Sequence, residues 1–330
     1  MSNEQRTPSS RSLMGVILAA GHGHRMWPFN ERYPKPILPV CNRPVIVYQI
    51  EMMRSLGISD VVILIGHKGY EITKVLGDGR ALGVRLQYVE QREMLGIAHA
   101  VGSLESVVDK PFMLFLGDIF FQAPRLGEMV EKFLEDPSGG VLATKEESDP
   151  EAIRRNYSIS LSDEGLVTRV IEKPRHTRNC LKGCGLYLFD LTIFDAIRRT
   201  PRTAMRNEYE LTDAIQVMID DGYPVRICNV VEEDMNLTNP ADLLVVNLRE
   251  ARTRWDGSLV ADSAHLARGA SIERSVIGAN VRVEHPIRIC DSVVFDDVVV
   301  ESRSPLTGVV VTPDRVVDCT DSLGTVARGE

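Results

Sequence analysis

The sequence has no apolar run approaching the roughly 20 residues that a membrane-spanning helix needs. Its first 13 residues are polar and contain no hydrophobic signal segment, so we expect a cytoplasmic protein with no membrane partner. Positively charged residues are also fewer than negatively charged ones: the sequence has 38 Lys and Arg and 46 Asp and Glu, which gives a net charge of −8. A nucleic acid is therefore not expected as the main partner.

Cysteine is sparse as well. Six cysteines are scattered over 330 residues without a C-x-x-C pair, which predicts reduced, mostly buried thiols and no disulfide framework. Cys180 and Cys184 are four residues apart, but no second Cys/His pair stands near them, so a zinc site is not expected. The 44% hydrophobic and 25% charged residues are typical of a globular protein with a large core.

Apolar runs alternate with helical patterns through the first part of the chain. Residues 14–20 form an apolar run that ends in a glycine-rich turn, and similar runs at 60–66 and 112–116 follow helical segments. This alternation predicts an α/β fold with a mostly parallel, doubly wound, Rossmann-like sheet. We interpret residues 141–239 as the second half of the same sheet. Ligands of such sheets bind at the carboxyl ends of the strands.

The C-terminal part has a different pattern. A helix over 240–254, with Asn239 as N-cap and Pro240 at its first position, is predicted to close the large domain. Beyond it, aliphatic residues recur every six positions, which predicts a parallel β-helix of about two coils. We therefore expect a disordered tail (1–13), a large domain (14–254) and a short β-helix with a tail (255–330). The residues on the six-residue frame are Val260, Leu266, Ile272, Val283, Ile289 and Phe295, with an irregular step around 275–278.

The glycine-rich turn after the first strand predicts a phosphate site, because glycines let backbone N–H groups approach an anion closely. Two common phosphate motifs fit poorly. The Walker pattern G-x-x-x-x-G-K-[ST] is absent. The dinucleotide fingerprint requires a third glycine where Met26 stands and an acidic residue after the second strand, where Gly66 and His67 stand.

The remaining pattern resembles the sugar-1-phosphate nucleotidylyltransferases, and especially the glucose-1-phosphate thymidylyl- and uridylyltransferases with a C-terminal left-handed β-helix. Their signature is G-x-G-x-R-[LMF]-x-P followed by P-K-x-x-L-P. We call residues 21–39 the signature segment. The matching positions are Gly21, Gly23, Arg25, Met26, Pro28, Pro34, Lys35, Leu38 and Pro39.

The resemblance implies how this segment binds a nucleotide. Ala20, Gly21 and Gly23 would place backbone around the phosphates. Arg25 offers a planar fork of donors to the β- and γ-phosphates, and Lys35 a compact charge to the phosphate under attack. Further along, residues 88–100 resemble the base-reading segment of the family. There Gln91 would pair with the edge of a uracil or thymine, and Gly96 would permit a close backbone approach.

The resemblance also implies a Mg²⁺ site. Asp118 ends a buried strand in the family's G-D pattern and is the expected first ligand. The second ligand of the family is an Asp in a segment that resembles residues 236–240, where this chain has Asn236. A neutral amide oxygen would therefore replace a carboxylate. Asp234 is the reserve ligand if Asn236 only ends a strand.

For the sugar phosphate, residues 171–174 match the family's E-K-P motif and residues 183–189 its G-x-Y segment. By analogy Glu172 accepts hydrogen bonds from sugar hydroxyls, and Lys173 neutralises the phosphate that acts as nucleophile. Gly185 and Glu208 are expected on the same side.

The expected reaction joins a nucleoside triphosphate and a sugar 1-phosphate into an NDP-sugar and pyrophosphate, with dTTP or UTP and glucose 1-phosphate as first choice. Guanylyl, adenylyl or cytidylyl transfer to another sugar or cyclitol phosphate stays open. So do a non-catalytic regulator that binds nucleotide sugars and an acyltransferase in the tail, where His265 and His285 lie. The family often assembles, so we expect a homo-oligomer.

Overall fold

The computed structural model describes residues 13–176, 180–204 and 206–326, so nearly all of the expected disordered tail lies outside the described residues. The chain folds into two compact units. The first contains the described residues up to Gly21 together with Tyr48–Asp234, and the second contains His22–Val47 and the chain from Met235 onward. Within the described ranges, no helix combines the length and hydrophobicity that a membrane crossing requires.

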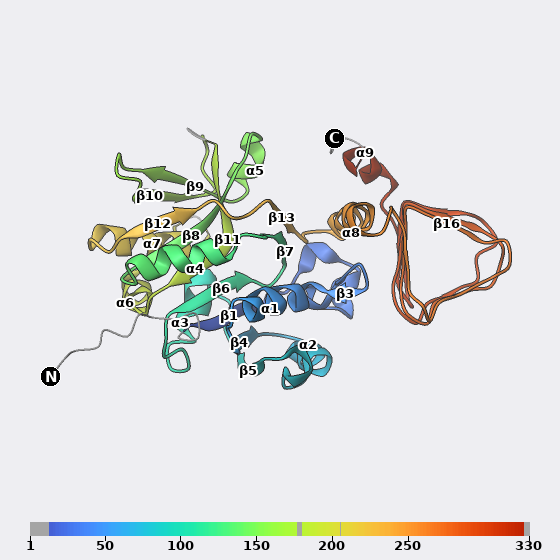
Figure 1. Cartoon of the computed structure of the whole chain (residues 1–330), viewed down its shortest axis with the longest axis horizontal. Coiled ribbons are helices and arrows are strands. Elements are labelled where there is room, and N and C mark those ends of the chain that lie inside the picture. Colours follow the sequence, from blue (N-terminus) through green and yellow to red (C-terminus); the bar gives the residue numbers. More distant parts are fainter. Residues whose placement is uncertain (1–12, 177–179, 205, 327–330) are drawn as a thin grey trace. The chain divides into compact units, whose positions relative to one another are not determined.

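The first unit is built on a nine-stranded mixed sheet whose main path is β10-β9-β11-β6-β1-β4-β5, as Figure 1 shows. Its parallel part consists of β1 (Met14–Ala19), β4 (Asp60–Ile65), β5 (Arg85–Glu90) and β6 (Phe112–Leu116). Strand β11 runs antiparallel to β6 and to β8, and β12 pairs with β8. The remaining strands are β8 (Gly140–Glu146), β9 (Tyr157–Leu161), β10 (Val167–Glu172), β11 (Leu181–Phe189) and β12 (Val225–Cys228).

Helices accompany this sheet as the alternating pattern predicts. Helices α3, α6 and α7 contact one another and share a core with the sheet that includes Phe112, Phe189 and Ile215. The central strands β1, β4 and β6 are apolar along nearly their whole length because side chains on both of their faces are buried. The helices are α1 (Val45–Ser55), α2 (Gly69–Leu76), α3 (Ile97–Gly102), α4 (Gly127–Glu135), α5 (Pro150–Arg154), α6 (Thr192–Arg199) and α7 (Leu211–Asp220).

Short elements connect these larger ones. Strand β7 (Ile119–Gln122) pairs with β13 (Glu233–Asn236) in a sheet of its own, and β2 (Pro39–Val40) pairs with β3 (Arg43–Pro44). The 3-10 turns η2 (His24–Met26), η3 (Phe29–Glu31) and η4 (Lys35–Ile37) shape the signature segment. A further turn, η5 (Arg80–Leu82), precedes β5.

In the second unit, α8 (Pro240–Arg254) begins where the sequence predicts. The Asn239 side chain accepts hydrogen bonds from the N–H groups of Ala241 (2.9 Å) and Asp242 (3.1 Å). The Asp242 carboxylate in turn accepts from the N–H of Asn239 at 2.9 Å, which completes a capping box. Such a cap is worth about 1 kcal/mol, so local chemistry alone fixes this helix start.

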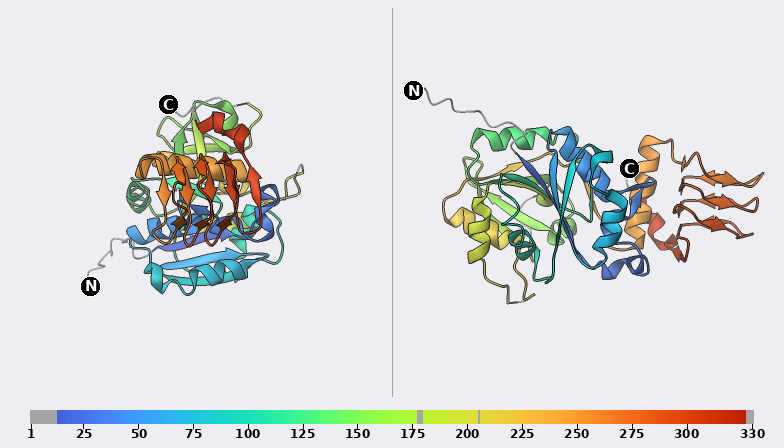
Figure 2. Two further views of the ribbon diagram at one scale, coloured as in Figure 1. Left: turned by 90° about the vertical axis from the view of Figure 1, so that its right-hand side faces the viewer. Right: turned by 90° about the horizontal axis from the view of Figure 1, so that it is seen from below.

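The residues after α8 form the predicted parallel β-helix, whose triangular coils are seen end-on in Figure 1 and stacked in Figure 2. The described residues form three complete coils and the start of a fourth, rather than about two. The first face holds β14 (Leu259–Val260), β17 (Val276–Ile277), β20 (Val293–Val294), β23 (Val309–Val311) and the antiparallel β24 (Val316–Asp318). The other faces hold β15 (His265–Leu266), β18 (Arg282–Val283) and β21 (Val299–Val300), and β16 (Ser271–Glu273), β19 (Arg288–Cys290) and β22 (Leu306–Thr307). The chain ends in η6 (Thr320–Ser322) and α9 (Leu323–Val326).

The register of these coils corrects the six-residue frame. Val260 pairs with Ile277, which pairs with Val294, so one coil takes 17 residues. Two of the three sides of the coil therefore advance by six residues, and the third advances by five. The irregular step noticed at 275–278 is therefore a feature of every coil. Assigning Phe295 to the frame is wrong by one position. Its ring instead packs against Phe29 and Tyr33, with centroids 5.9 and 5.5 Å apart.

Candidate functional site

In the second unit, Lys35 lies against the glycine turn. Gly23 has a left-handed backbone conformation (φ +63°), and a Cβ built there would come within 3.1 Å of the Lys35 Cγ and 3.3 Å of its Cε. Lys35 itself is only 8% exposed, although it is charged. The structure therefore brings together two residues that the sequence assigned to one phosphate site.

The rest of the turn is open. Gly21 is exposed, and a Cβ built on it would meet no described atom within 4 Å, so packing does not require glycine there. Arg25 is exposed on η2, while the neighbouring Met26 is fully buried and anchors the turn. His22 and His24 are exposed, with their rings 5.3 Å apart. An open glycine backbone and an exposed guanidinium are each groups that an anion can approach.

In the first unit, four predicted residues follow the carboxyl ends of three parallel strands. Ala20 and Gly21 follow β1, Gln91 follows β5, and Asp118 follows β6. Because these strands are parallel, their carboxyl ends share one edge of the sheet. Asp118 is half-buried in the turn between β6 and β7.

The segment around Gln91 is held by backbone contacts. Gln91 N–H donates to Ile65 O at 2.7 Å, and its side-chain Nε2 donates to Glu93 O at 2.9 Å. Gly96 has φ +113°, and a Cβ there would lie 2.4 Å from Tyr209 O. The close backbone approach at Gly96 is thus made by Tyr209, so this glycine joins the 88–100 segment to the segment that contains Glu208.

The donor set at the expected metal site suits a hard cation. Asp118 offers carboxylate oxygens, and Asn236, exposed at the end of β13, offers an amide oxygen. No cluster of three or more His, Cys, Asp or Glu suited to a metal occurs among the described residues. Mg²⁺ is commonly held by one or two carboxylates together with water and substrate phosphates, so these residues fit it without a protein cage.

Asp234, the reserve ligand, has another partner. Its side chain is fully buried, and its Oδ1 accepts a hydrogen bond from Lys182 Nζ at 2.6 Å. Burial raises the pKa of Asp234, and the Lys182 ammonium opposes that shift. A buried, paired carboxylate has little freedom to reach a metal. Lys182 was not among the sequence-predicted residues; the signal was a lysine within an otherwise apolar strand.

Glu172 and Lys173 lie together with two residues of the 206–213 segment. Arg206 reaches Glu172 (3.6 Å) and Glu210 (2.9 Å), and Lys173 lies 3.7 Å from the Glu172 carboxylate. Burial raises the pKa of Glu172, Glu210 raises it further, and Lys173 and Arg206 oppose the shift. The cluster thus combines two carboxylates and two cations, groups suited to sugar hydroxyls and a phosphate. Arg206 and Glu210 were not among the residues predicted from the sequence.

Two other predicted residues have visible structural roles. A Cβ on Gly185 would lie 2.6 Å from Ile119 Cδ1 and 2.7 Å from Leu116 Cδ1, so this glycine lets β11 pack on the turn of Asp118. Glu208 accepts a backbone hydrogen bond from Thr203 N–H at 2.9 Å and is half-buried.

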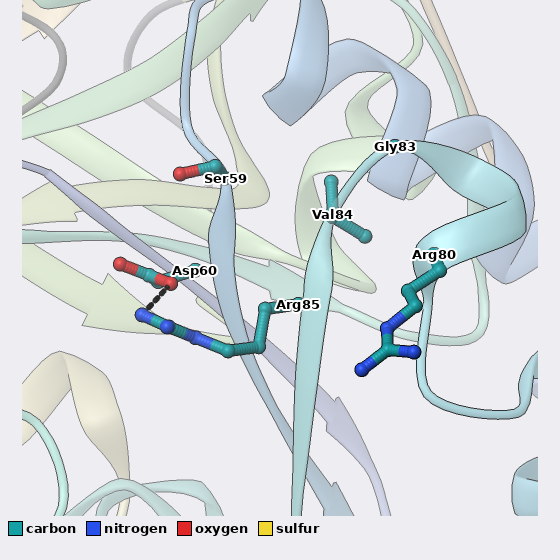
Figure 3. A pocket seen from close by; sticks show the side chains of 6 residues that line it. All are labelled: Ser59, Asp60, Arg80, Gly83, Val84 and Arg85. Atoms are coloured by element: carbon teal, nitrogen blue, oxygen red, sulfur yellow. Dashed lines mark hydrogen bonds and ion pairs between the residues drawn. The ribbon is translucent and has the colours of Figure 1, made fainter.

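A separate cavity of about 420 Å³ lies at the amino ends of β4 and β5. Figure 3 shows Arg85 directed at its ion-pair partner Asp60, while Arg80 points elsewhere. This is the edge opposite to Gly21, Gln91 and Asp118. The cavity is therefore not part of the candidate site.

A parallel sheet with a glycine turn, a lysine packed against that turn and a carboxylate after the central strand are features of enzymes that act on nucleotides. A family model described as nucleotidyl transferase matches residues 14–235, and the chain belongs to that family. A second model, described as GlmU-like, C-terminal hexapeptide, matches residues 240–327. The resemblance and the fold predicted from the sequence are thereby confirmed.

Curated relatives extend over most of the chain. A glucose-1-phosphate thymidylyltransferase of Streptomyces griseus is 31% identical over 328 residues, which cover 93% of this chain and 90% of the relative. The low-salt glycan biosynthesis nucleotidyltransferase Agl11 of Haloferax volcanii is 35% identical over 270 residues (78% and 74%). The UTP–glucose-1-phosphate uridylyltransferase AglF of the same organism is 33% identical over 230 residues (70% and 93%).

Solved structures show the same architecture. A Bacillus anthracis protein described as a candidate glucose-1-phosphate thymidylyltransferase matches with a TM-score of 0.64 and 26% identity, over 71% of this chain and 94% of that one. A UDP-glucose pyrophosphorylase bound to UDP-glucose matches with a TM-score of 0.64 over 73% and 99% of the two chains. At 20% identity, the second match supports the fold alone.

Proposed function

We propose that this nucleotidyl transferase acts on a sugar 1-phosphate and produces an NDP-sugar and pyrophosphate. Glucose 1-phosphate with dTTP or UTP is the preferred substrate pair, because relatives of both specificities match most of the chain. The observation that carries the proposal is Lys35, a nearly buried cation beside Gly23 in the turn that matches the family signature.

In the proposed reaction, a phosphate oxygen of the sugar 1-phosphate attacks the α-phosphorus of the triphosphate. The new P–O bond forms as the bond to the β-phosphate oxygen breaks, and pyrophosphate leaves. The nucleophile is already ionised, so no general base is required, and catalysis consists of positioning and charge stabilisation.

Each predicted residue has a role in this proposal. The backbone of Ala20, Gly21 and Gly23 holds the phosphates. Arg25 and Lys35 offset the negative charge that develops on them. Gln91 selects the base through its amide.

The sugar phosphate is assigned to the other cluster. Glu172 accepts hydrogen bonds from sugar hydroxyls, and Lys173 neutralises the attacking phosphate. Arg206 and Glu210, which contact this pair or each other, hold it in place. Glu208 and Gly185 complete this side.

Asp118 and Asn236 would hold Mg²⁺, which when bound supplies a further positive charge next to the phosphates. The chain's own contribution is to present one carboxylate and one neutral amide. We also propose a cytoplasmic location and a homo-oligomeric assembly, both on the resemblance to the family.

A pyrophosphate-release panel tests this function. The full chain is incubated with each of five triphosphates and several sugar 1-phosphates in the presence of Mg²⁺. We expect one pair, with dTTP or UTP, to release pyrophosphate in amounts equal to the NDP-sugar formed. Pyrophosphate release with GTP, ATP or CTP, or only with a cyclitol phosphate, would assign the chain a different substrate specificity within the family. Binding of labelled triphosphate without pyrophosphate from any pair would identify a regulator.

A further inference from the structure

Gln49 is a fully buried polar side chain in α1, a helix whose other buried residues are apolar. Its Nε2 donates two hydrogen bonds, one to the carbonyl oxygen of Leu116 at 2.9 Å and one to that of Ile119 at 2.8 Å. Because both partners are acceptors, they fix the orientation of the amide. One side chain therefore joins two points on a short stretch of backbone.

That stretch is the turn that carries Asp118. Leu116 ends β6, Ile119 begins β7, and only Gly117 and Asp118 lie between them. The N–H of Gly117 donates to Leu18 O of β1 at 2.9 Å, which fixes the turn to the neighbouring strand. With Gln49 bound to the carbonyls before and after it, the turn has little freedom to change the direction of the Asp118 carboxylate.

Core packing alone does not account for Gln49. Its Oε1 is buried and has no hydrogen-bond partner among the described residues. An unpaired buried acceptor costs about 1–3 kcal/mol. A methionine of similar volume would avoid that cost. What methionine cannot do is donate to the two carbonyls, so the hydrogen bonds to the turn are the property that distinguishes glutamine here.

We propose that Gln49 is a positioning residue for the metal site and that it directs Asp118 toward a divalent cation. The inference depends on the proposed function only in taking Asp118 as a metal ligand. Mg²⁺ requires near-ideal octahedral geometry, so a small displacement of a ligand weakens its binding. Removal of a group that orients a metal ligand typically reduces affinity 10–100-fold.

The test measures metal binding directly in the full chain, with Mn²⁺ as a probe visible by electron paramagnetic resonance. Wild type, Gln49→Met and Asp118→Ala are titrated with Mn²⁺ alone and with Mn²⁺ plus dTTP, without sugar phosphate. We expect Gln49→Met to weaken Mn²⁺ binding about tenfold. Gln49→Leu is the second variant if Gln49→Met does not fold.

The matched control is Ile50→Val on the same helix. It removes a buried methylene at a cost of about 0.5–1.5 kcal/mol and leaves the hydrogen bonds of the turn in place. We expect its Mn²⁺ affinity to equal that of the wild type, which separates positioning from a general loss of stability.

Equal Mn²⁺ affinity in Gln49→Met and the wild type, with a clear loss in Asp118→Ala, overturns the positioning role. Equal Mn²⁺ affinity in the wild type and Asp118→Ala would show that Asp118 is not a metal ligand, which overturns the inference as well. A wild type that binds Mn²⁺ through Asp118 but releases no pyrophosphate contradicts the proposed function alone, because the comparison of Mn²⁺ affinities requires no turnover.

Discussion

The side chain of Lys35 occupies the space beside Gly23 that a Cβ would need, with its Cγ 3.1 Å from that position. Backbone and side chain are thus fitted to each other at the proposed phosphate site. A methyl group at position 23 would displace the lysine from the place where it is proposed to meet the α-phosphate.

We therefore predict that Gly23→Ala lowers kcat about tenfold, because Lys35 has to shift by a few tenths of an ångström, whereas a displacement of about 1 Å of a catalytic group can cost about a hundredfold. Gly165→Ala is the matched control. Gly165 also has a positive φ (+80°), but a Cβ there meets no described atom within 4 Å. Steady-state kinetics and thermal unfolding of both variants separate backbone strain from the displacement of Lys35. Equal kcat values in the two variants would contradict this explanation.

The proposed metal ligands give a second prediction. Asp118→Ala should lower turnover by orders of magnitude while the fold stays intact, and near-normal rates at saturating Mg²⁺ would refute the assignment. Asn236→Asp adds a negative charge, so it should lower the Mg²⁺ concentration for half-maximal velocity. Asp234→Asn should leave that concentration unchanged, because Asp234 is buried against Lys182. A shift in Asp234→Asn alone would make Asp234 the ligand.

Local patterns in the sequence predicted those features whose cause is local. The capping box of α8 involves only residues 239–242, and the alternation of strand and helix follows from burial of whole strands. The 17-residue coil was missed because six-residue counting through position 295 places Phe295 where Val294 stands.

Features that join distant segments could not be predicted in this way. The pairing of β7 with β13 and the contact of Lys182 with Asp234 leave no periodic signal in the sequence. Gly96 shows the same limit for a site residue. Its pattern indicates a close backbone approach, but only the structure shows that Tyr209 makes it. No local sequence pattern predicts that residues 22–47 belong to one compact unit with the C-terminal coils.

A third prediction concerns pH. Burial raises the pKa of Glu172, and Glu210 adds to the shift against Lys173 and Arg206. The carboxylate form is the one that accepts hydrogen bonds from a sugar. KM for the sugar 1-phosphate should therefore increase as pH falls through this raised pKa, at a higher pH than for an ordinary glutamate. Glu172→Gln should have a high KM without this component of the pH dependence.

Protonation of Glu172 affects stability in the opposite direction to its expected effect on binding, so unfolding through this group cannot explain a rise in KM at low pH. Because the pKa of Glu172 is raised in the folded protein, the folded state binds this proton at a higher pH than the unfolded chain does. Acidification between the raised and the ordinary pKa therefore favours folding at this group. The phosphate of the substrate also titrates, but it does so equally in assays of the wild type and of Glu172→Gln. An identical pH dependence of KM in both would contradict the role of Glu172, and circular dichroism verifies that both stay folded.

The last prediction concerns Phe295, which is 5% exposed on the β-helix and packs against Phe29 and Tyr33 of the signature segment. Ion pairs flank these rings: Arg32 with Asp314 at 2.6 Å and Glu31 with Arg315 at 3.6 Å. Exposed pairs of this kind contribute about 0–1 kcal/mol, so the buried ring dominates the contact.

Phe295→Ala should destabilise the protein by about 3–5 kcal/mol. It should also lower kcat at temperatures where the variant is still folded, because the segment that Phe295 supports carries Arg25 and Lys35. Phe295→Leu keeps most of the volume and should lose less of both, while Val299→Ala, at a position 42% exposed, should change neither. Thermal unfolding and kcat are measured on the same samples. A loss of stability with kcat unchanged would show that the β-helix supports the fold of the signature segment but not the geometry of its cations.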